Sequence, residues 1–320
     1  MLELAEVSKI YRIREGGLLS AKSRTVTAVD GVNLLVNDHE TTALLGPNGA
    51  GKSTLCKMAA GMIKPTSGKV YLDGVEVTKN IASVSKKIGV VLGPSLVYYR
   101  MRGRQYLRFF ARVYQVKECE SRIEQLSEEL GIRDVLDEYI EEYSTGMKMK
   151  ISLARALLHE PPFLVLDEFT SGLDPVAALK IRELVKSSRK TILLTTHNPH
   201  EAEVMADKVA FMSKGKLVAH GSPTDLIHWA SDRVRVVVTA GDPQGVAATL
   251  RGLAVASDSG TTAESLRFSV KESEVPSLLR EISKHDLRSI NIERPSLEDA
   301  YAKFAGQPLR QAPGDEESIT

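Results

Sequence analysis

The sequence has little of what would place a chain in a specialised class. Only two of its 320 residues are cysteines, Cys56 and Cys119, and their spacing forms no motif, which fits free thiols in a reducing cytosol. No apolar run approaches the roughly 18 residues of a membrane-spanning helix. Neither sign of charge is in excess, because 42 Lys and Arg residues oppose 41 Asp and Glu residues. The net charge therefore gives no global attraction to nucleic acid, and the composition is that of an ordinary globular protein.

The first two thirds of the sequence alternate between strand-like and helix-like segments. Several of the expected strands are apolar on both faces, as buried strands of a parallel sheet are. They cover residues 41–46, 87–93, 163–168, 191–197 and 208–221. Helical spacing separates them, at 53–63, 103–116 and 147–159. This alternation predicts an α/β fold with a mainly parallel core sheet, in a domain over residues 1–228.

A second pattern starts after Asp232. Strand-like segments at 233–240, 265–270 and 287–294, with a short one near 254–258, alternate with helical segments at 243–253 and 274–286. The order is βαββαβ, which predicts a small ferredoxin-like or ACT-like α+β domain over residues 232–306 that ends in a helix. The tail, residues 307–320, has few apolar residues and is expected to be disordered.

A glycine-rich loop joins the strand at 41–46 to the following helix. Its spacing, four residues between a glycine and a Gly-Lys-Ser triplet, is that of a phosphate-binding loop. Glycines let backbone N–H groups wrap a triphosphate at close range, Lys52 would reach the β- and γ-phosphates, and Ser53 would hold Mg²⁺. The residues expected to bind phosphate are Gly46, Pro47, Asn48, Gly49, Ala50, Gly51, Lys52, Ser53 and Thr54.

Polar side chains end two further apolar strands. Asp167 and Glu168 end the strand at 163–168, and His197 ends the strand at 191–197. The carboxyl ends of parallel strands meet at one edge of the sheet, where ligands bind. Asp167 fits the carboxylate that associates with Mg²⁺ in phosphate-loop enzymes. Glu168 could polarise an attacking water, and His197 is expected to contact the γ-phosphate.

A second phosphate site is indicated at the start of the helix at 147–159. Ser144, Thr145 and Gly146 precede this helix. Small hydroxyl and glycine residues at a helix N-terminus leave backbone N–H groups free to bind an anion. The domain thus carries two predicted phosphate sites, which raises the question of whose phosphate the second one holds.

Five motifs in this order resemble the nucleotide-binding subunit of an ABC transporter, over about residues 1–226. They are the phosphate loop (46–54), the signature (143–147), the acidic strand (163–168), "SGLDP" (171–175) and His197. The resemblance implies an ABC cassette in which an antiparallel β-subdomain and a helical subdomain, at about 95–158, accompany the core sheet. It also implies ATP and Mg²⁺ as cofactors, and an ATPase activity coupled to transmembrane transport, with Glu168 and His197 as its catalytic groups.

The resemblance implies partners as well. In the family two cassettes bind head to tail with two ATP molecules between them, so that Ser144, Thr145 and Gly146 of one chain cap the nucleotide held by the other. Tyr11 would stack on adenine, and Asp174 would help to link the two sites. A separate integral-membrane permease would hold the pair at the cytoplasmic face of the cell membrane. No nucleic acid is expected to bind.

The chain departs from the broad family pattern at two places. The usual Leu-Ser-Gly-Gly-Gln signature reads Tyr-Ser-Thr-Gly-Met, which resembles the ABC-2-type branch of drug and sodium exporters. The second domain resembles an accessory domain of the same branch, with a dimer-strengthening or a ligand-sensing role. The glutamine that touches Mg²⁺ in the family is missing, because Gly93, Pro94 and Ser95 stand at that point. Water or Ser95 would then complete the Mg²⁺ shell.

Two questions stay open at the level of the sequence. The basic residues of segment 98–114 indicate either a solvated helix face or a surface that docks the permease beside anionic lipid. They are Arg100, Arg102, Arg104, Arg108 and Arg112. For the whole chain, the alternatives to an exporter subunit are a soluble ABC-type ATPase that acts on ribosomes or DNA, and a weakly hydrolysing regulatory cassette.

Overall fold

The computed structural model describes residues 1–15, 22–93, 97–252, 265–304 and 310–311. Contacts within the chain divide it into two compact units. The first unit comprises Met1–Pro223 and Pro308–Thr320, and the second comprises Thr224–Gln307. The helix that follows Pro223 thus belongs by its contacts to the second unit, whereas the sequence prediction placed it in the first domain. Apart from residues 310–311, the predicted disordered tail lies outside the described residues.

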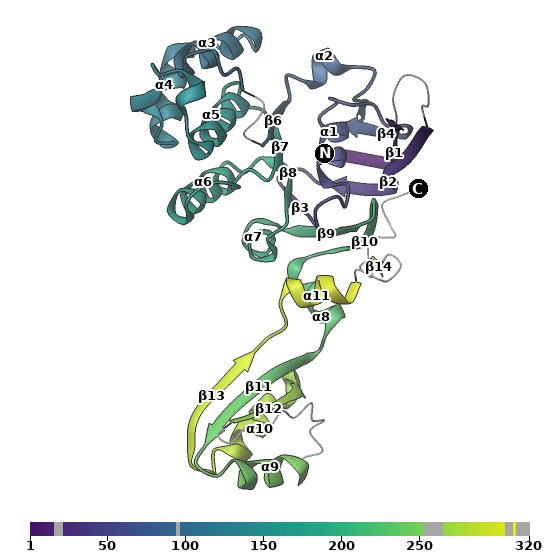
Figure 1. Cartoon of the computed structure of the whole chain (residues 1–320), viewed down its shortest axis with the longest axis vertical. Coiled ribbons are helices and arrows are strands. Elements are labelled where there is room, and N and C mark those ends of the chain that lie inside the picture. Colours follow the sequence, from purple (N-terminus) through teal and green to yellow (C-terminus); the bar gives the residue numbers. More distant parts are fainter. Residues whose placement is uncertain (16–21, 94–96, 253–264, 305–309, 312–320) are drawn as a thin grey trace. The chain divides into compact units, whose positions relative to one another are not determined.

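The core of the first unit is a seven-stranded sheet (Figure 1). Its order is β14-β10-β9-β3-β8-β7-β6, and the five strands from β9 to β6 run parallel. The strands are β3 (Thr41–Leu45), β6 (Ile88–Leu92), β7 (Phe163–Asp167), β8 (Thr191–Thr196), β9 (Lys208–Ser213), β10 (Lys216–Gly221) and β14 (Arg310–Gln311). Every residue of β3 and β8 is buried, which explains their apolar character on both faces. The predicted parallel core sheet is confirmed.

The segment at 208–221 forms a hairpin, not one continuous strand. β9 and β10 pair antiparallel, and the turn between them holds Lys214 and Gly215, both with positive φ. The Lys-Gly pair supplies the left-handed backbone that a tight hairpin turn needs. β10 is therefore antiparallel to the five parallel strands, and β14 pairs with its outer side.

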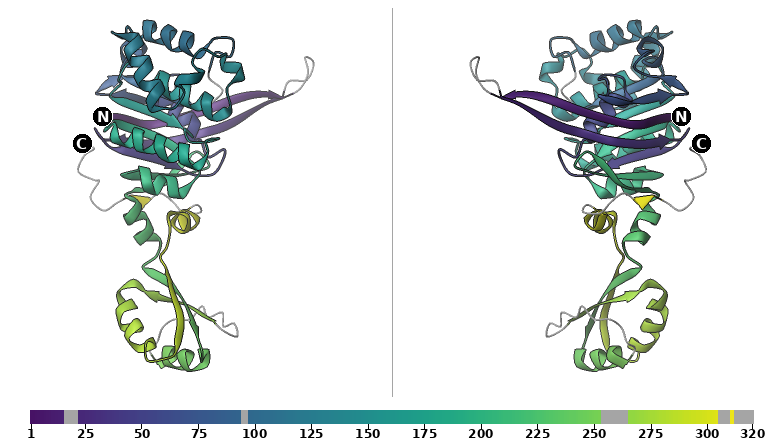
Figure 2. Two further views of the ribbon diagram at one scale, coloured as in Figure 1. Left: turned by 90° about the vertical axis from the view of Figure 1, so that its left-hand side faces the viewer. Right: turned by 90° about the vertical axis from the view of Figure 1, so that its right-hand side faces the viewer.

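A second, antiparallel sheet packs against the first one across helix α1 (Lys52–Ala59). Its order is β2-β1-β4-β5. The strands are β1 (Leu2–Glu15), β2 (Lys22–Val36), β4 (Ser67–Leu72) and β5 (Val75–Glu76). Figure 2 shows that the β1–β2 ribbon extends well beyond the sheet that it starts in. Leu2, Val29 and Val36 of this ribbon share a buried cluster with Leu55 and Met58 of α1.

The remaining helices of the first unit form two groups (Figure 1). Those that accompany the sheets are α2 (Ile81–Val84), α6 (Pro175–Ser187) and α7 (Pro199–Met205). Those of the helical subdomain are α3 (Gly103–Val113), α4 (Cys119–Glu129) and α5 (Thr145–Leu157), with the short 3-10 helices Arg133–Val135 and Ile140–Glu142. α5 joins this subdomain to the core sheet, because Arg155 Nη2 donates to Val90 O of β6 at 2.6 Å.

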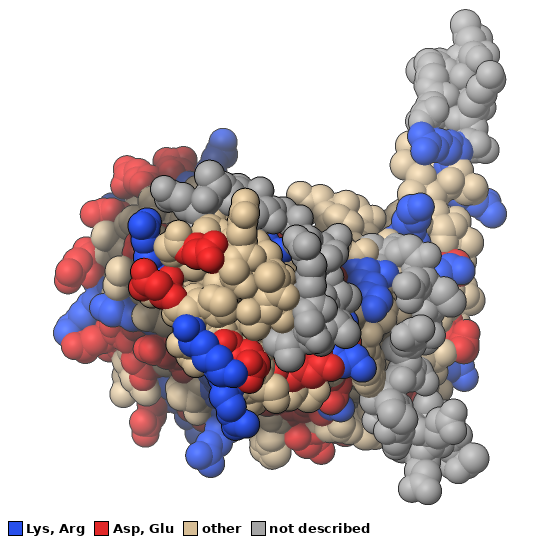
Figure 3. Space-filling model, turned by 90° about the horizontal axis from the view of Figure 1, so that it is seen from below, with Lys and Arg blue, Asp and Glu red and all other residues tan. Residues whose placement is uncertain are grey.

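Two of the five arginines of segment 98–114 hold α3 and α4 together. Arg104 Nη1 lies 2.5 Å from Glu124 Oε1, and Arg108 Nε lies 2.5 Å from Glu120 Oε1. These two side chains are thus committed within the helical subdomain. The face drawn in Figure 3 mixes basic and acidic side chains over its left part, whereas Lys and Arg predominate on the arm at its upper right.

The second unit is a three-stranded antiparallel sheet with helices on one face. Its order is β12-β11-β13. The elements are α8 (Pro223–Ala230), β11 (Arg233–Ala240), α9 (Pro243–Gly252), β12 (Ser265–Lys271), the 3-10 helix Glu272–Glu274, α10 (Val275–Ile282), β13 (Leu287–Glu293) and α11 (Leu297–Phe304). Val234, Val236 and Val238 face a core completed by α9 and α10. The predicted strand near 254–258 lies outside the described residues.

Among the described residues, no helix combines the length and the apolar character needed to cross a membrane.

His159, just after α5, provides a pH-dependent test of the packing. Its ring stacks on Tyr114, with the centroids 4.0 Å apart, and burial lowers its pKa from 6.5 to about 4. Between these two values the unfolded chain binds a proton that the folded chain does not. The free energy of unfolding should therefore fall as the pH drops from about 6.5 to about 4.

The substitution His159→Phe keeps an aromatic ring against Tyr114 and removes the titration. We expect it to flatten the decline in the free energy of unfolding over that pH window, as measured by urea denaturation at several pH values. His228→Phe, at an exposed site of α8, is the matched control and should leave the slope unchanged. Equal slopes for all three proteins would contradict the assignment to His159.

Candidate nucleotide-binding site

The phosphate loop is held between backbone groups of both sheets. A Cβ on Gly46 would lie 2.3 Å from Met212 O of β9, and a Cβ on Gly51 would lie 2.2 Å from Ala28 O of β2. Gly51 also has φ of +105°, which side chains rarely adopt. Only glycine fits at these two positions. The sequence motif thus reflects a close approach of three chain segments as well as the approach of a ligand.

Lys52 is the first residue of α1 and is buried. Its Nζ donates to Gly46 O at 2.6 Å and to Pro47 O at 3.1 Å, so the amine lies over the loop. Burial lowers the pKa of Lys52, while Glu168 and Asp167 raise it. The N-terminus of α1 carries no side-chain cap, so its first N–H groups stay available to an anion. Thr54 follows in the same first turn.

The rest of the loop lies between these two glycines. Ala50 is buried, and its N–H donates to Pro47 O at 3.2 Å. Asn48 and Gly49 are exposed, and a Cβ on Gly49 would meet nothing within 4 Å. This part of the loop is therefore open to a ligand.

Asp167, at the end of β7, is bonded to two hydroxyl groups. Ser53 Oγ donates to Asp167 Oδ1 at 2.9 Å, and Thr195 Oγ1 of β8 donates to the same oxygen at 2.5 Å. The predicted Mg²⁺ residues Ser53 and Asp167 thus meet at the end of the sheet. Thr195 was not foreseen from the sequence. The available signal was its register, because β7 and β8 pair Asp167 with Thr195.

Glu168 and His197 form the second pair at this edge. His197 Nδ1 lies 3.2 Å from Glu168 Oε1, and both side chains are partly exposed. Glu168 has φ of +49°, although it is not a glycine. Its N–H is held by Thr195, through the backbone O and Oγ1, both at 3.2 Å. A residue kept in the left-handed region by such contacts is typical of a functional position.

The signature residues begin α5, in the helical subdomain. Ser144 is the N-cap, and its Oγ accepts a hydrogen bond from Met147 N at 3.2 Å. Tyr143 is buried and donates its hydroxyl to Val135 O, and burial raises its pKa to about 12. A Cβ on Gly103 would lie 2.2 Å from this hydroxyl, so Gly103 leaves room for it. The signature is therefore a fixed helix start and not a free loop.

The signature also contacts the "SGLDP" segment of the same chain. A Cβ on Gly172 would lie 2.8 Å from Thr145 Cγ2, and a Cβ on Gly146 would lie 3.2 Å from Leu173 Cδ2. Asp174 caps α6, since its Oδ1 accepts from Val176 N and from Ala177 N. Because Gly172 and Leu173 lie against Thr145 and Gly146, a displacement of Asp174 and α6 would also displace the start of α5.

Tyr11 lies on the β1–β2 ribbon that borders the loop. It pairs with Val26, two residues before Ala28, whose carbonyl touches Gly51. The ring is partly exposed, and Lys9 Nζ lies 5.4 Å from its centroid.

The sequence has Gly93, Pro94 and Ser95 at the point where the family has a glutamine. Gly93 has φ of +68°, and Pro94 and Ser95 lie outside the described residues.

The donor set at this edge fits Mg²⁺ bound together with a phosphate. Within the described residues, no group of three or more His, Cys, Asp and Glu side chains could hold a metal ion alone. Mg²⁺ usually takes one or two protein oxygens, with phosphate oxygens and water as its other ligands. Ser53 Oγ and Asp167 Oδ1, 2.9 Å apart, supply two oxygens beside the loop.

A glycine cradle, a buried lysine over it, an oxygen pair and a Glu–His pair thus meet at the carboxyl edge of a parallel sheet. This arrangement defines a phosphate-loop nucleotide-binding domain. Comparison with known proteins gives the family. Residues 29–171 match the family described as "ABC transporter".

Relatives extend the match along the chain. It is 30% identical to the linearmycin resistance ATP-binding protein LnrL of Bacillus subtilis over 296 residues, which cover 89% of this chain and 95% of the relative. It is 33% identical to the Nod factor export ATP-binding protein I of Neorhizobium galegae, over 97% of this chain and 86% of the relative. A solved structure titled as the ATP binding subunit of an ABC transporter superimposes with a TM-score of 0.62 at 27% identity, covering 71% of this chain and 92% of that one. The chain belongs to the ABC transporter family, as an ATP-binding subunit, and the resemblance seen in its sequence is confirmed.

The role of Thr195 can be tested with an isosteric substitution. Thr195→Val removes the hydroxyl that donates to Asp167 and accepts from Glu168 N. We expect the free energy of unfolding to fall by about 1–3 kcal/mol, because buried polar groups lose a partner. Thr27→Val, on an exposed position of β2, is the control. Urea denaturation measures both, and equal stability of the two variants would contradict this role.

Proposed function

We propose that this chain is the ATP-hydrolysing subunit of a membrane exporter and that it works as a head-to-tail pair. One observation carries the proposal. Two candidate nucleotide half-sites lie in different parts of the first unit: the phosphate loop with Asp167, Glu168 and His197, and the signature residues Ser144–Gly146 at the start of α5 (Figure 1). Each half-site offers donors for phosphate.

Hydrolysis would use the groups at the sheet edge. A water beside Glu168 attacks the γ-phosphorus of ATP, the bond to the leaving oxygen of ADP breaks, and the water proton passes to the Glu168 carboxylate. His197 Nδ1 lies 3.2 Å from that carboxylate, and the ring would donate one hydrogen bond to a γ-phosphate oxygen. Lys52 and the loop N–H groups hold the β- and γ-phosphates. Mg²⁺, held by Ser53 and Asp167, supplies the positive charge that balances the phosphates.

The pairing follows from where the two half-sites lie. α1 packs between the two sheets, whereas α5 packs on β6, α3 and α4. A second copy, turned head to tail, would bring its Ser144 and Gly146 over the nucleotide of the first. The free N–H groups at the start of α5 would then face the γ-phosphate. Tyr11 would stack on adenine, and Asp174 would connect the paired sites.

A permease would dock on the helical subdomain. Tyr98, Tyr99, Phe109 and Val113 are each exposed by more than two fifths, which is unusual for large apolar side chains so close together. Tyr98 also packs edge-on against Phe109, with ring centroids 6.0 Å apart. An apolar helix of a membrane subunit would cover this aromatic surface and place the chain at the cytoplasmic face of the membrane.

Export as the direction of transport is supported by the relatives. One confers linearmycin resistance and another exports Nod factor, according to their names, and the match to each covers most of both chains. The Tyr-Ser-Thr-Gly-Met signature supports the same ABC-2-type branch.

Glu168→Gln tests the hydrolytic step. We expect ATP hydrolysis to fall by about 10²–10⁴-fold, because the amide cannot accept the water proton, while ATP binding persists. The bound ATP should then stabilise the dimer, which gel filtration with and without ATP measures. Glu183→Gln, at an exposed position of α6, is the matched control and should hydrolyse normally. Normal turnover by Glu168→Gln protein would exclude Glu168 as the base.

A mixing experiment tests the shared sites. Lys52→Ala damages the loop and Gly146→Asp damages the signature, so each homodimer has two inactive sites. A mixed dimer keeps one intact site, formed by Lys52 of one chain and Gly146 of the other. We expect the mixture to recover up to about a quarter of wild-type ATPase activity, because half of the dimers are mixed and have one working site.

The control mixture combines Lys52→Ala with Glu168→Gln. Both changes fall in the same half-site, so every site in every dimer is impaired and no recovery is expected. If the first mixture were no more active than the separate variants, the head-to-tail arrangement would be wrong.

A further inference from the structure

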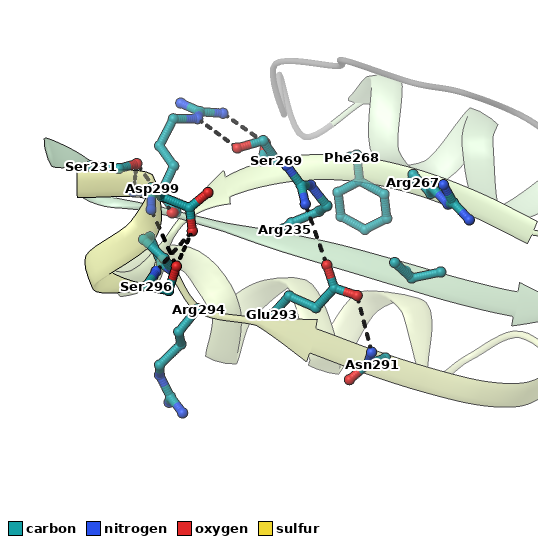
Figure 4. Close-up of a pocket in the computed structure, with 13 residues that line it drawn as sticks. Ser231, Arg235, Arg267, Phe268, Ser269, Asn291, Glu293, Arg294, Ser296 and Asp299 are labelled. Carbon is teal, nitrogen blue, oxygen red and sulfur yellow. Dashed lines mark hydrogen bonds and ion pairs between the residues drawn. The ribbon is translucent and has the colours of Figure 1, made fainter. Parts of the chain in front are cut away.

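A groove of about 710 Å³ lies in the second unit, and no residue of the nucleotide site lines it (Figure 4). Strands β11, β12 and β13 form its floor. Ser231, Ser296 and Asp299, next to the sheet, close one end, as Figure 4 shows. The volume is in the range of small-molecule sites in proteins. The residues proposed for ATP hydrolysis do not include any that line this groove.

The groove occupies the face of the sheet that the helices leave open. On β11, Val234, Val236 and Val238 point to the core under α9 and α10. Side chains alternate along a strand, so Arg235 and Val237 belong to the opposite face. The open face is lined by polar and charged residues from all three strands. Solvation alone needs no such concentration of arginine.

The pairing register of β12, β11 and β13 places the side chains of the groove floor in two rows that cross the strands. Ser269, Arg235 and Glu293 lie opposite one another in the first row. Arg267, Val237 and Asn291 lie opposite one another in the second row. Arg235 and Arg267 are therefore diagonal neighbours, and such pairs lie about 7–8 Å apart at Cα. A tetrahedral oxyanion above Val237 would have both guanidinium groups within reach.

The arginines of the groove differ in how they are bound. Arg233 donates to Ser269, from Nε to Oγ at 3.2 Å and from Nη2 to the backbone O at 2.7 Å. Arg294 Nε donates to Glu272 Oε1 at 2.7 Å. Arg235 Nη1 has only a long contact with Glu293 Oε2, at 3.5 Å. Arg267 is exposed and makes no polar side-chain contact within the described part of the chain. Arg235 and Arg267 thus have donors to spare.

The two carboxylates that line the groove do not neutralise it. Asp299 accepts from Ser296 N at 2.9 Å and from its Oγ at 2.8 Å, which is a capping arrangement at the start of α11. These bonds lower the pKa of Asp299. Glu293 is shared between Arg235 and Asn291. Arg294 is paired with Glu272, which leaves Arg233, Arg235 and Arg267 against two committed carboxylates, so the groove has an excess of positive charge.

We propose that this groove binds a phosphate monoester of a hydroxyl-bearing small molecule. The phosphate lies over Val237, between the guanidinium groups of Arg267 and Arg235, and the Asn291 amide donates from the third strand. The hydroxyl groups of the ester lie toward Ser269, whose hydroxyl offers a donor, and toward Glu293, whose carboxylate offers an acceptor. The site does not depend on ATP or on pairing of the chain.

The groove chemistry favours a phosphate over other anions. One arginine fork engages both oxygens of a carboxylate, whereas a phosphate dianion has three terminal oxygens in a tetrahedral arrangement and can accept from two forks that approach from different sides. The lining has one aromatic residue, Phe268, which also belongs to the apolar core, so no ring stands free to stack on a base. A phosphorylated polyol fits this lining better than a nucleotide does.

Two sources share this chemistry, a soluble ester and a lipid headgroup. Glycerol 3-phosphate and phosphatidic acid carry the same group in these two forms. We would titrate the full-length protein with glycerol 3-phosphate by calorimetry, and measure its co-sedimentation with phosphatidylcholine vesicles with and without phosphatidic acid. Binding of the soluble ester identifies a metabolite site. Binding of the vesicles alone identifies a lipid headgroup site.

Arg267→Gln and Arg235→Gln should each weaken binding by about tenfold or more, since each loses a charged hydrogen bond. Arg267→Lys keeps the charge but loses the fork, and should bind between wild type and Arg267→Gln. Arg280→Gln removes one positive charge from the exposed side of α10 and should bind as wild type does. Absence of binding to both probes would overturn the proposal. Equal losses for the Arg267 and Arg280 variants would also overturn it.

Discussion

The nucleotide site depends on one steric constraint, the approach of two backbone carbonyls to the phosphate loop. Met212 O and Ala28 O would each lie closer than 2.5 Å to a Cβ at Gly46 and Gly51. The first carbonyl comes from the parallel sheet and the second from the antiparallel ribbon, so the loop is where the two sheets meet. Its shape is set by this packing before any ligand arrives. The same ribbon carries Tyr11, which places the expected adenine contact beside the expected phosphate contacts.

The charges at the sheet edge follow from that position. Lys52 is buried over the loop, and its pKa is lowered by burial and raised by Glu168 and Asp167. A buried amine needs such carboxylates nearby, and the carboxylates in turn need donors. Thr195 Oγ1 donates to the Asp167 carboxylate and accepts from the backbone N–H of Glu168, whose φ is positive. The residues that would bind a triphosphate therefore also stabilise one another in the structure without a nucleotide.

Local patterns predicted the strands of the core sheet, the phosphate loop and the acidic strand end, because each of these features depends on consecutive residues, whereas the antiparallel sheet was expected only from the family resemblance. The glycine spacing, the burial of β3 and β8, and the ends of β7 and β8 all fall in this class. Thr195 was missed because a threonine in a strand is ordinary until register pairs it with Asp167. The commitment of Arg104 and Arg108 to α4 depends on side chains 12 or more positions away. Such distant pairing has no periodic signature in one sequence.

In the second unit, too, the sequence alone does not reveal which residues lie side by side on the surface of the sheet. The sequence predicted a strand at 233–240, and in the structure Val234, Val236 and Val238 of this strand form part of the core. What the opposite face offers depends on which residues of β12 and β13 lie beside Arg235 and Val237, and only the register decides that. The core of the second unit lies on the other face of the sheet, so core packing does not determine which residues occupy this face. Neighbouring arginines on this face repel one another, which lowers the stability of the fold. An anionic ligand therefore explains their presence better than a contribution to stability does.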